Sequence, residues 1–380
     1  MTRYCLAACA ALLLGSLAAR AQTAPAPAAA RAVDLAICLD TSGSMNGLID
    51  AARQKLWAIV NDLALARPAP RLRLALLSFG NNGHRKEDGW VSILVPFTED
   101  LDLVSQRLFA LTTNGGEEYV GRVLQAATDR LEWSRSPDAL KLIFVAGNES
   151  ADQDREVPFR DACKKAIGRG VQVNPVYCGP GAGDEATLWR EVATLADGHF
   201  AAIDHNHGTV AITTPFDTDL QKLGGDLNAT YVPLGRKGAE GWQNQFDQDK
   251  NAASVNEATA AGRAATKASM LYVCSWDLVD ACAQKQVKLE DVKDEDLPEA
   301  LRKMTVEERR KHLEEMSKRR EALKRQIQEL EAKRQAHLAA EMKKSALSAD
   351  QAFDYAVRAA VRAQAAAKGF EFEAKSAGRE

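Results

Sequence analysis

The stretch "AICLDTSGSM" at residues 36–45 runs from apolar residues into an acid followed by small hydroxyl side chains. Its apolar half is typical of a buried strand. The chain then turns on Gly43, so that Asp40, Ser42 and Ser44 can point to one side of a loop as separate oxygen ligands. Carboxylate and hydroxyl oxygens suit a hard cation: Mg²⁺, Mn²⁺ or Ca²⁺. In the alternative interpretation, a serine caps the next helix and Asp40 bonds backbone amides.

The chain around this loop alternates between apolar, strand-like segments and amphipathic, helix-like segments. Strand patterns occur at residues 32–39, 72–80, 90–97, 139–147 and 171–179, and a short segment at 198–204 completes the series. Apolar strands separated by helices are typical of a mostly parallel sheet covered on both faces. We therefore predict a doubly wound, Rossmann-like α/β domain with a six-stranded sheet over residues 32–235. Ligands of such sheets bind at the carboxyl ends of the strands, where the DTSGS loop lies.

These features resemble a von Willebrand factor A domain. The resemblance rests on Asp40-x-Ser42-x-Ser44, on the alternation over residues 33–210, and on the sequence NGG at 114–116. In that family, two serines and a later threonine hold a divalent cation at a metal-ion-dependent adhesion site. Two aspartates support the cation, and a carboxylate of a partner protein often completes its shell. The resemblance implies protein–protein interaction, and strings such as "LIFVAGNE" are similar to an exported bacterial subgroup.

The sequence departs from the family pattern at two positions. Glu117 and Glu118 follow the glycines where the threonine is expected, and "AGNE" at 146–149 replaces a pattern like Thr-Asp-Gly. A glutamate adds a negative charge and the missing aspartate removes one, so we expect a modified site with a similar total charge. In the alternative, the glutamates are first-turn helix acids and no metal binds. The predicted metal-site residues are Asp40, Ser42, Ser44, Glu117, Glu118 and Asn148.

The N-terminus has the pattern of an export signal. Arg3 precedes the apolar run at residues 5–19, and Ala19-Arg20-Ala21 is typical of a cleavage site. The run is short for a membrane span. We expect cleavage of residues 1–21, a Pro/Ala linker at 22–31, and a periplasmic or secreted bacterial protein with no transmembrane span left.

Five cysteines remain after this cleavage: Cys38, Cys163, Cys178, Cys274 and Cys282. Disulfides persist in an exported protein. Cys163 and Cys178 are a candidate pair, and the odd number leaves at least one thiol free.

The last third of the chain changes character. Residues 236–296 form an Ala/Gln-rich connecting segment with an apolar patch around Trp276, and residues 297–380 are rich in Lys, Arg and Glu. Heptad spacing predicts a long helix here, but Arg320 and Arg334 interrupt its apolar seam. A solvated helix, a hairpin with residues 349–367, and self-association through a coiled coil at 297–345 all remain open.

The function we predict is binding of an unknown protein partner, without catalysis, through the modified metal site. A metal-free scaffold in a cell-envelope complex is the first alternative. A metal-dependent hydrolase is the second, with Glu118 as base, but no further base or nucleophile supports it. A net charge of -3 gives no reason to expect nucleic acid as a partner. Residues 204–207 (DHNH) are a weaker metal candidate.

Overall fold

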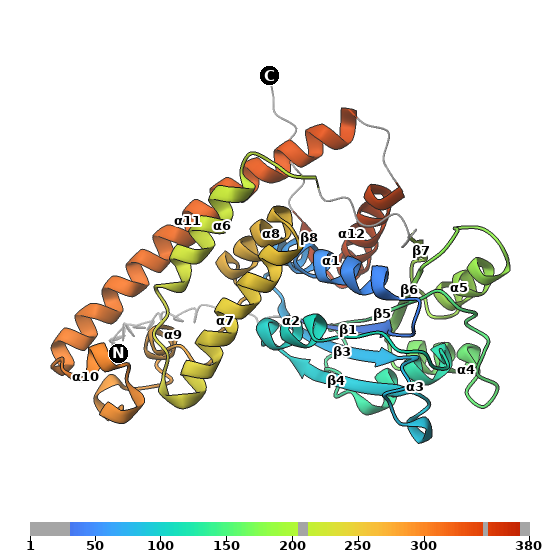
Figure 1. Cartoon of the computed structure of the whole chain (residues 1–380), viewed down its shortest axis with the longest axis horizontal. Coiled ribbons are helices and arrows are strands. Elements are labelled where there is room, and N and C mark those ends of the chain that lie inside the picture. The colour runs from blue at the N-terminus through green and yellow to red at the C-terminus, as the bar shows by residue number, and fades with distance from the viewer. Residues whose placement is uncertain (1–30, 204–211, 345–348, 373–380) are drawn as a thin grey trace, which may run out of the picture.

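The computed structural model describes residues 31–203, 212–344 and 349–372. Its centre is a six-stranded sheet in the order β4-β3-β1-β5-β6-β7, parallel throughout except for the antiparallel pair of β3 and β4. The predicted fold class is therefore confirmed (Figure 1). The strands of this sheet are β1 (Ala32–Asp40), β3 (Arg71–Phe79), β4 (Val91–Thr98), β5 (Leu140–Gly147), β6 (Gln172–Tyr177) and β7 (Ala201–Ala202).

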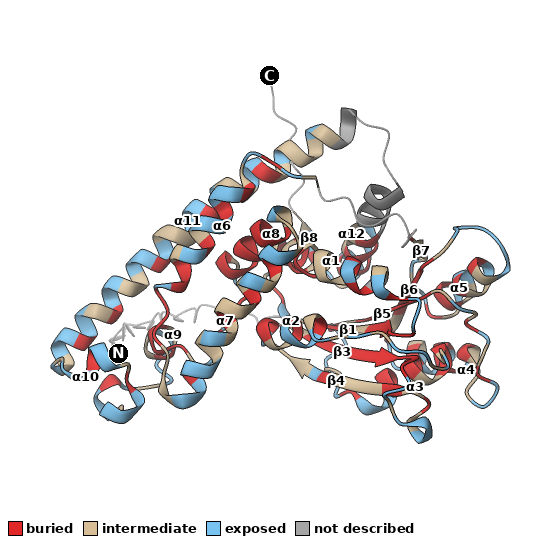
Figure 2. Ribbon diagram, in the orientation of Figure 1, coloured by how far each residue is buried: buried red, intermediate tan, exposed pale blue. Residues whose placement is uncertain are grey.

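Helices cover both faces of the sheet because the strand residues alternate between two hydrophobic cores. Leu35 and Leu39 of β1 point into one core, whereas Ala36 and Cys38 point into the other. The central strands are accordingly buried along most of their length (Figure 2). The first core packs against α1 (Asn46–Ala64) and α2 (Leu101–Phe109), and the second against α3 (Val120–Arg130), α4 (Phe159–Gly168) and α5 (Asp184–Leu195).

The two cores explain why one predicted disulfide does not form. Cys163 of α4 is buried in the second core, and Cys178, after β6, is buried in the first. The sheet therefore lies between the two thiols. All five cysteines within the described residues are free.

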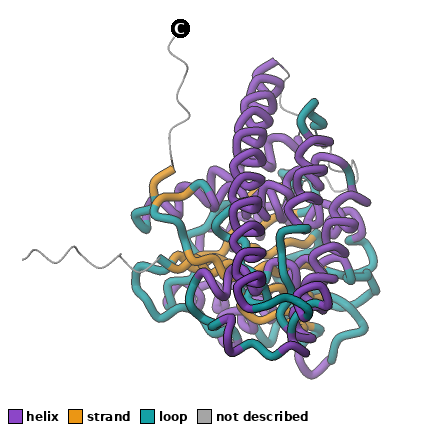
Figure 3. The backbone as a smooth tube through the Cα atoms, turned by 90° about the vertical axis from the view of Figure 1, so that its left-hand side faces the viewer, coloured by secondary structure: helices purple, strands orange, loops and turns teal. Residues whose placement is uncertain are grey.

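A group of helices follows β7 and lies beside the sheet domain (Figures 1 and 3). Figure 3 views the molecule from the side of this helical layer and shows it in front of the strands. Its members are α6 (Asp217–Asn228), α7 (Gly235–Val255), α8 (Glu257–Ala268), α9 (Leu278–Ala283), α10 (Glu299–Arg302) and α11 (Val306–Lys344). Two short 3-10 turns, Leu289–Asp291 and Asp294–Asp296, connect α9 to α10, and a third, Lys86–Asp88, lies between β3 and β4 of the sheet domain.

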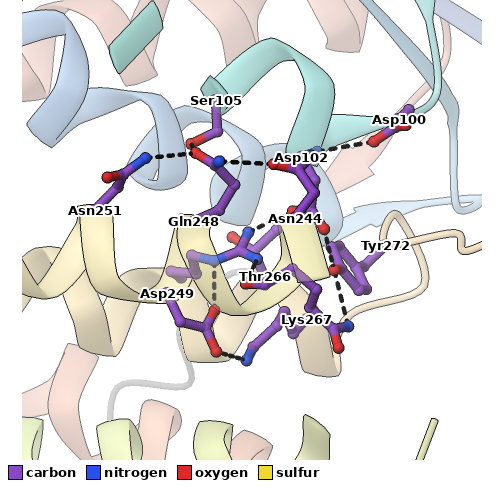
Figure 4. A network of polar contacts seen from close by, with 12 residues as sticks. Asp100, Asp102, Ser105, Asn244, Gln248, Asp249, Asn251, Thr266, Lys267 and Tyr272 are labelled. Atoms are coloured by element: carbon purple, nitrogen blue, oxygen red, sulfur yellow. Dashed lines mark hydrogen bonds and ion pairs between the residues drawn. The ribbon is translucent and has the colours of Figure 1, made fainter. Parts of the chain in front are cut away.

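A buried polar network joins this layer to the sheet domain (Figure 4). Asp102 of α2 forms an ion pair with Arg263 of α8 at 2.8 Å and accepts a hydrogen bond from the Tyr272 hydroxyl at 2.6 Å. Asp249 of α7 accepts from the Arg263 Nε at 2.6 Å and from Lys267 Nζ at 2.5 Å. The two carboxylates neutralise the two cationic side chains, so this network anchors α7 and α8 to α2 of the sheet domain.

The helix α11 packs within the chain, and its interrupting arginines hold it there. Arg320 is 2% exposed and bonds Asp277 at 2.7 Å, and Arg334 is 7% exposed and bonds Asp217 at 2.7 Å. Ile327, on the same seam, is fully buried. The seam predicted for a coiled coil between copies is therefore filled by α6, α8 and α9 of the same chain. The main contacts of α11 are thus not with residues 349–367, as the alternative of a helical hairpin would require.

The last helix returns to the sheet domain instead. α12 (Ala349–Ala367) packs on α1 and β7, and β8 (Glu371–Phe372) pairs with β2 (Ala66–Arg67). Gln364 exchanges two hydrogen bonds of 3.0 Å with Asn174 of β6. The predicted boundary at residue 235 therefore does not separate all of the sheet domain from the later helices. α12 packs on the sheet domain, and α6 to α11 lie between β7 and α12 in the sequence.

Candidate functional site

The predicted metal loop leaves the sheet at the carboxyl end of its central strand. Asp40 ends β1 and is fully buried, and its Oδ1 accepts a hydrogen bond of 2.8 Å from the Ser42 backbone N–H. This bond turns the chain, and α1 begins at Asn46. The Ser42 and Ser44 hydroxyl oxygens lie 3.5 Å apart. The loop therefore brings one carboxylate and two hydroxyls together, as the spacing predicts.

Two neighbouring loops add further oxygen atoms. The Asp40 and Glu118 side chains both pack against Gly80, after β3. A Cβ atom at this position would lie 2.8 Å from Asp40 Oδ1 and 3.0 Å from Glu118 Cγ. Gly80 has a φ of 72°, which glycine adopts without strain. After β5, Asn148 donates a hydrogen bond of 3.2 Å to the Ser44 hydroxyl. Four of the other five predicted residues thus surround Asp40.

Glu117 is the exception among the predicted ligands. Its side chain is exposed and interacts with Tyr119 rather than with the serines. The prediction that Glu117 is a metal ligand is therefore not supported by its position. The acid that approaches Asp40 and Glu118 instead is Glu149, which the sequence reasoning missed. It is next to Asn148, but nothing in the local sequence separates it from an ordinary loop acid.

Asn81 is a second residue that the sequence reasoning missed, and it joins the loops of the site. Its Nδ2 donates to the backbone carbonyls of Thr41 at 3.2 Å and Thr112 at 3.0 Å. The Thr41 carbonyl also accepts from the Asn114 N–H at 3.0 Å. Asn81 therefore fixes the spacing between the metal loop and the loop that carries Glu118. The one available signal was an asparagine directly after a buried strand.

The electrostatics of the site favour a cation. The pKa of Asp40 is raised to about 7, mainly by burial and to a smaller extent by the Glu118 and Glu149 charges, whereas the hydrogen bonds from Ser42 lower it. Burial, and then Glu149, also raise the pKa of Glu118. Asp40 Oδ2 is buried with no hydrogen-bond partner. A buried carboxylate oxygen is costly without a partner, so these residues fit a bound divalent cation.

No cluster of three His, Cys, Asp or Glu side chains with metal-binding spacing occurs among the described residues. The candidate site depends on serine hydroxyls, which such a cluster does not include. Residues 204–207, the weaker metal candidate, lie outside the described residues.

A serine and a histidine lie within hydrogen-bond distance of each other beside the site. His84 Nε2 lies 2.7 Å from the Ser78 hydroxyl, but Ser78 is 1% exposed, so this hydroxyl is buried away from any substrate.

The substitution Asp40→Asn tests this electrostatic interpretation. The asparagine side chain keeps the Oδ1 acceptor but cannot ionise. The folded-state pKa of Asp40, about 7, exceeds its unfolded value, so protonation stabilises the wild type below about pH 4 and this stabilisation is lost as the pH rises to 7. In EDTA, Asp40→Asn is therefore expected to be more stable than wild type by about 1–3 kcal/mol at pH 8.

Denaturant unfolding between pH 4 and pH 8 measures this difference, with the exposed Asp219→Asn as control. The advantage of Asp40→Asn should grow with pH across this window. A constant difference, or one that shrinks with rising pH, would contradict a buried, unpaired Asp40 carboxylate.

Comparison with known proteins identifies the domain. Residues 35–149 match the family model described as the von Willebrand factor type A domain. The chain therefore contains a von Willebrand factor type A domain, and the resemblance that its sequence predicts is confirmed. No curated protein matches the chain.

Several solved structures are similar to about half of this chain. They include a von Willebrand factor type A protein from Catenulispora acidiphila, at 18% identity over 47% of this chain and 40% of that one, with a TM-score of 0.36. Proximal thread matrix protein 1 from the mussel byssus, with a zinc-occupied MIDAS motif, matches at 15% identity over 47% and 43%, with a TM-score of 0.35. The pilus adhesin SpaC from Lactobacillus rhamnosus GG matches at 15% identity over 46% and 28%, with a TM-score of 0.35. The chain thus spans less than half the length of these proteins.

Proposed function

We propose that this chain is an exported binding protein that engages a protein partner at a modified cation site. Von Willebrand factor type A domains generally mediate protein–protein interactions. The residues that would hold the cation are Asp40, Ser42, Ser44 and Glu118, with Asn148 beside Ser44. The observation that carries the proposal is the buried Asp40 Oδ2, which has no partner and lies among other oxygen-bearing side chains.

The bound Mg²⁺, Mn²⁺ or Ca²⁺ would supply a Lewis-acid anchor for the partner. The protein's own groups bind and orient: the Ser42 amide fixes Asp40, and Asn81 fixes the loop of Glu118. We propose that no reaction is catalysed, so that the chain acts by binding. We also propose export after cleavage between Ala21 and Gln22. No helix of the described residues is long and apolar enough to cross a membrane.

Cation-dependent capture of a partner tests this function. The full mature chain is immobilised and exposed to a cell-envelope fraction in Mn²⁺ or in EDTA. A partner should be retained in Mn²⁺, released by EDTA, and absent with Ser42→Ala/Ser44→Ala, while the exposed Ser254→Ala control retains it. Capture that is indifferent to EDTA and to both serines would contradict the proposal and favour the metal-free scaffold.

A further inference from the structure

A lysine, an asparagine and an aspartate from three different helices meet inside the helical layer. Lys267 of α8 donates a hydrogen bond of 2.7 Å to the side-chain carbonyl of Asn228, at the end of α6. The Asn228 Nδ2 donates to Asp249 Oδ2 of α7 at 2.7 Å. Lys267 Nζ donates to the same Asp249 oxygen at 2.5 Å (Figure 4). Each of the three side chains therefore contacts the other two.

Close packing of α6 against α8 holds the lysine beside the asparagine. A Cβ atom on Gly224 of α6 would lie 2.8 Å from Ala264 Cβ of α8, so the glycine permits this approach. Lys267 Nζ also donates to the Gly224 carbonyl at 2.9 Å. Lys267 and Asn228 are each 1% exposed. Three hydrogen bonds in a buried position thus orient the amine next to the Asn228 side-chain carbon, as a reaction between the two requires.

The surroundings of the amine favour its uncharged form. Burial lowers the pKa of Lys267, against the Asp249 charge, which raises it. Burial raises the pKa of Asp249, but the charges of Lys267 and Arg263 outweigh this effect and lower it. Asp249 is therefore a carboxylate that can accept the lysine proton, and a neutral, desolvated lysine is a nucleophile. Arg263 bonds the other Asp249 oxygen at 2.6 Å and leaves Oδ2 to the lysine and the asparagine.

A cavity of about 240 Å³ lies beside the three side chains. Asn228, Asp249 and Lys267 line it, together with glycines of α6 and alanines of α7 and α8. Its lining includes the exposed residues Gly225 and Ala253, and the Asp249 side chain is itself 24% exposed. A small molecule released from the asparagine therefore has a path to solvent.

We propose that Lys267 and Asn228 form an intramolecular isopeptide bond, with Asp249 as the proton carrier. Asp249 Oδ2 takes a proton from the Lys267 ammonium group, and the neutral amine attacks Asn228 Cγ. The Nζ–Cγ bond forms and the Cγ–Nδ2 bond breaks, while Asp249 passes protons to the leaving nitrogen. An ammonium side chain and a primary amide thus become a secondary amide and an ammonium ion. The step needs no oxidant, reductant or further reactant.

The bond joins α6 to α8 covalently across 39 positions of the chain. Such a cross-link restricts the unfolded chain as a disulfide does. It needs no thiol, and the five cysteines of the described residues are free. Asp249 keeps Arg263 as its counter-ion after Lys267 has lost its charge. The cross-link is independent of the cation site, so this inference goes beyond the proposed function.

Mass spectrometry of the full chain after tryptic digestion tests the proposal. Trypsin does not cut after an acylated lysine, so we expect residues 223–236 joined to residues 264–285. The joined peptide should have a mass about 17 Da below the sum of the two, for one ammonia lost. The peptide is a sharper readout than the intact mass, because an N-terminal glutamine or an Asn-Gly pair also loses ammonia. Free peptides 223–236 and 264–267 without the joined peptide would overturn the proposal.

Matched variants assign the roles of the three residues. Asn228→Ala should yield no joined peptide, and Asp249→Ala, which keeps both partners of the bond, should yield at least about tenfold less than wild type. Lys250→Gln, which removes an exposed lysine of α7, should yield as much as wild type. Yields are compared on protein with the near-ultraviolet circular dichroism of wild type, and the wild-type digest alone decides whether the bond exists. An equal yield from Asp249→Ala and wild type would overturn the role of Asp249.

Discussion

Replacing Arg320 with methionine is expected to lower the free energy of unfolding by about 3–5 kcal/mol. Arg320 is 2% exposed, and its guanidinium bonds Asp277 and Asp280, each at 2.7 Å, and the Thr230 carbonyl at 2.6 Å. It also stacks 4.0 Å from the centre of the Tyr231 ring. The variant leaves the Asp277 carboxylate buried without its counter-ion, and this unpaired charge is the source of the loss.

Arg319→Met is the matched control, because the adjacent arginine is exposed on the same helix. Denaturant unfolding of the full chain should place this variant within about 0.5 kcal/mol of wild type. Similar losses in the two variants would mean that α11 is not anchored through Arg320. The docking of the inserted helices would then need another explanation.

Glutamate at position 365 is expected to cost at least about 4 kcal/mol, enough to remove most of the stability of an ordinary domain. Ala365 of α12 is fully buried in the first core together with Val361 and Phe370. The substitution forces a larger, charged side chain into a packed space with no partner for its charge. The expected effect follows only if α12 completes the sheet domain.

The neighbouring Ala366 is exposed, so Ala366→Glu provides the same substitution on the other side of the helix. We expect a cost below about 1 kcal/mol, from a negative charge near the helix C-terminus. Thermal unfolding and near-ultraviolet circular dichroism of both variants make the comparison. If Ala365→Glu were tolerated as well as Ala366→Glu, α12 would not be part of the domain core.

Local patterns predicted the sheet but not how the chain closes over it. Strands such as "ALKLIFVAG" can be recognised from the sequence as continuous apolar runs, because both of their faces are buried. The return of α12 depends on contacts such as Gln364 with Asn174, which are 190 positions apart, and no local pattern encodes that distance. Arg320 and Arg334 looked like defects of an apolar seam because their acidic partners lie on other helices.

The candidate site was predicted in the same uneven way. Asp40, Ser42 and Ser44 are close in sequence, so one loop brings them together. Glu118 also reaches the site, but its sequence neighbour Glu117 points elsewhere, and spacing alone could not distinguish the two. Glu149 and Asn81 join the site only because the carboxyl ends of parallel strands meet at one edge of the sheet.

The measurement that tests the central claim most directly is unfolding of the full chain, freed of metal with EDTA and titrated with Mg²⁺, Mn²⁺ and Ca²⁺. A cation at about 100 times its dissociation constant should raise the free energy of unfolding by about 2.7 kcal/mol in wild type. Ser42→Ala/Ser44→Ala should gain nothing from the same ion. If none of the three ions stabilises wild type, or if the serine variant gains as much as wild type, the site does not bind a cation as proposed.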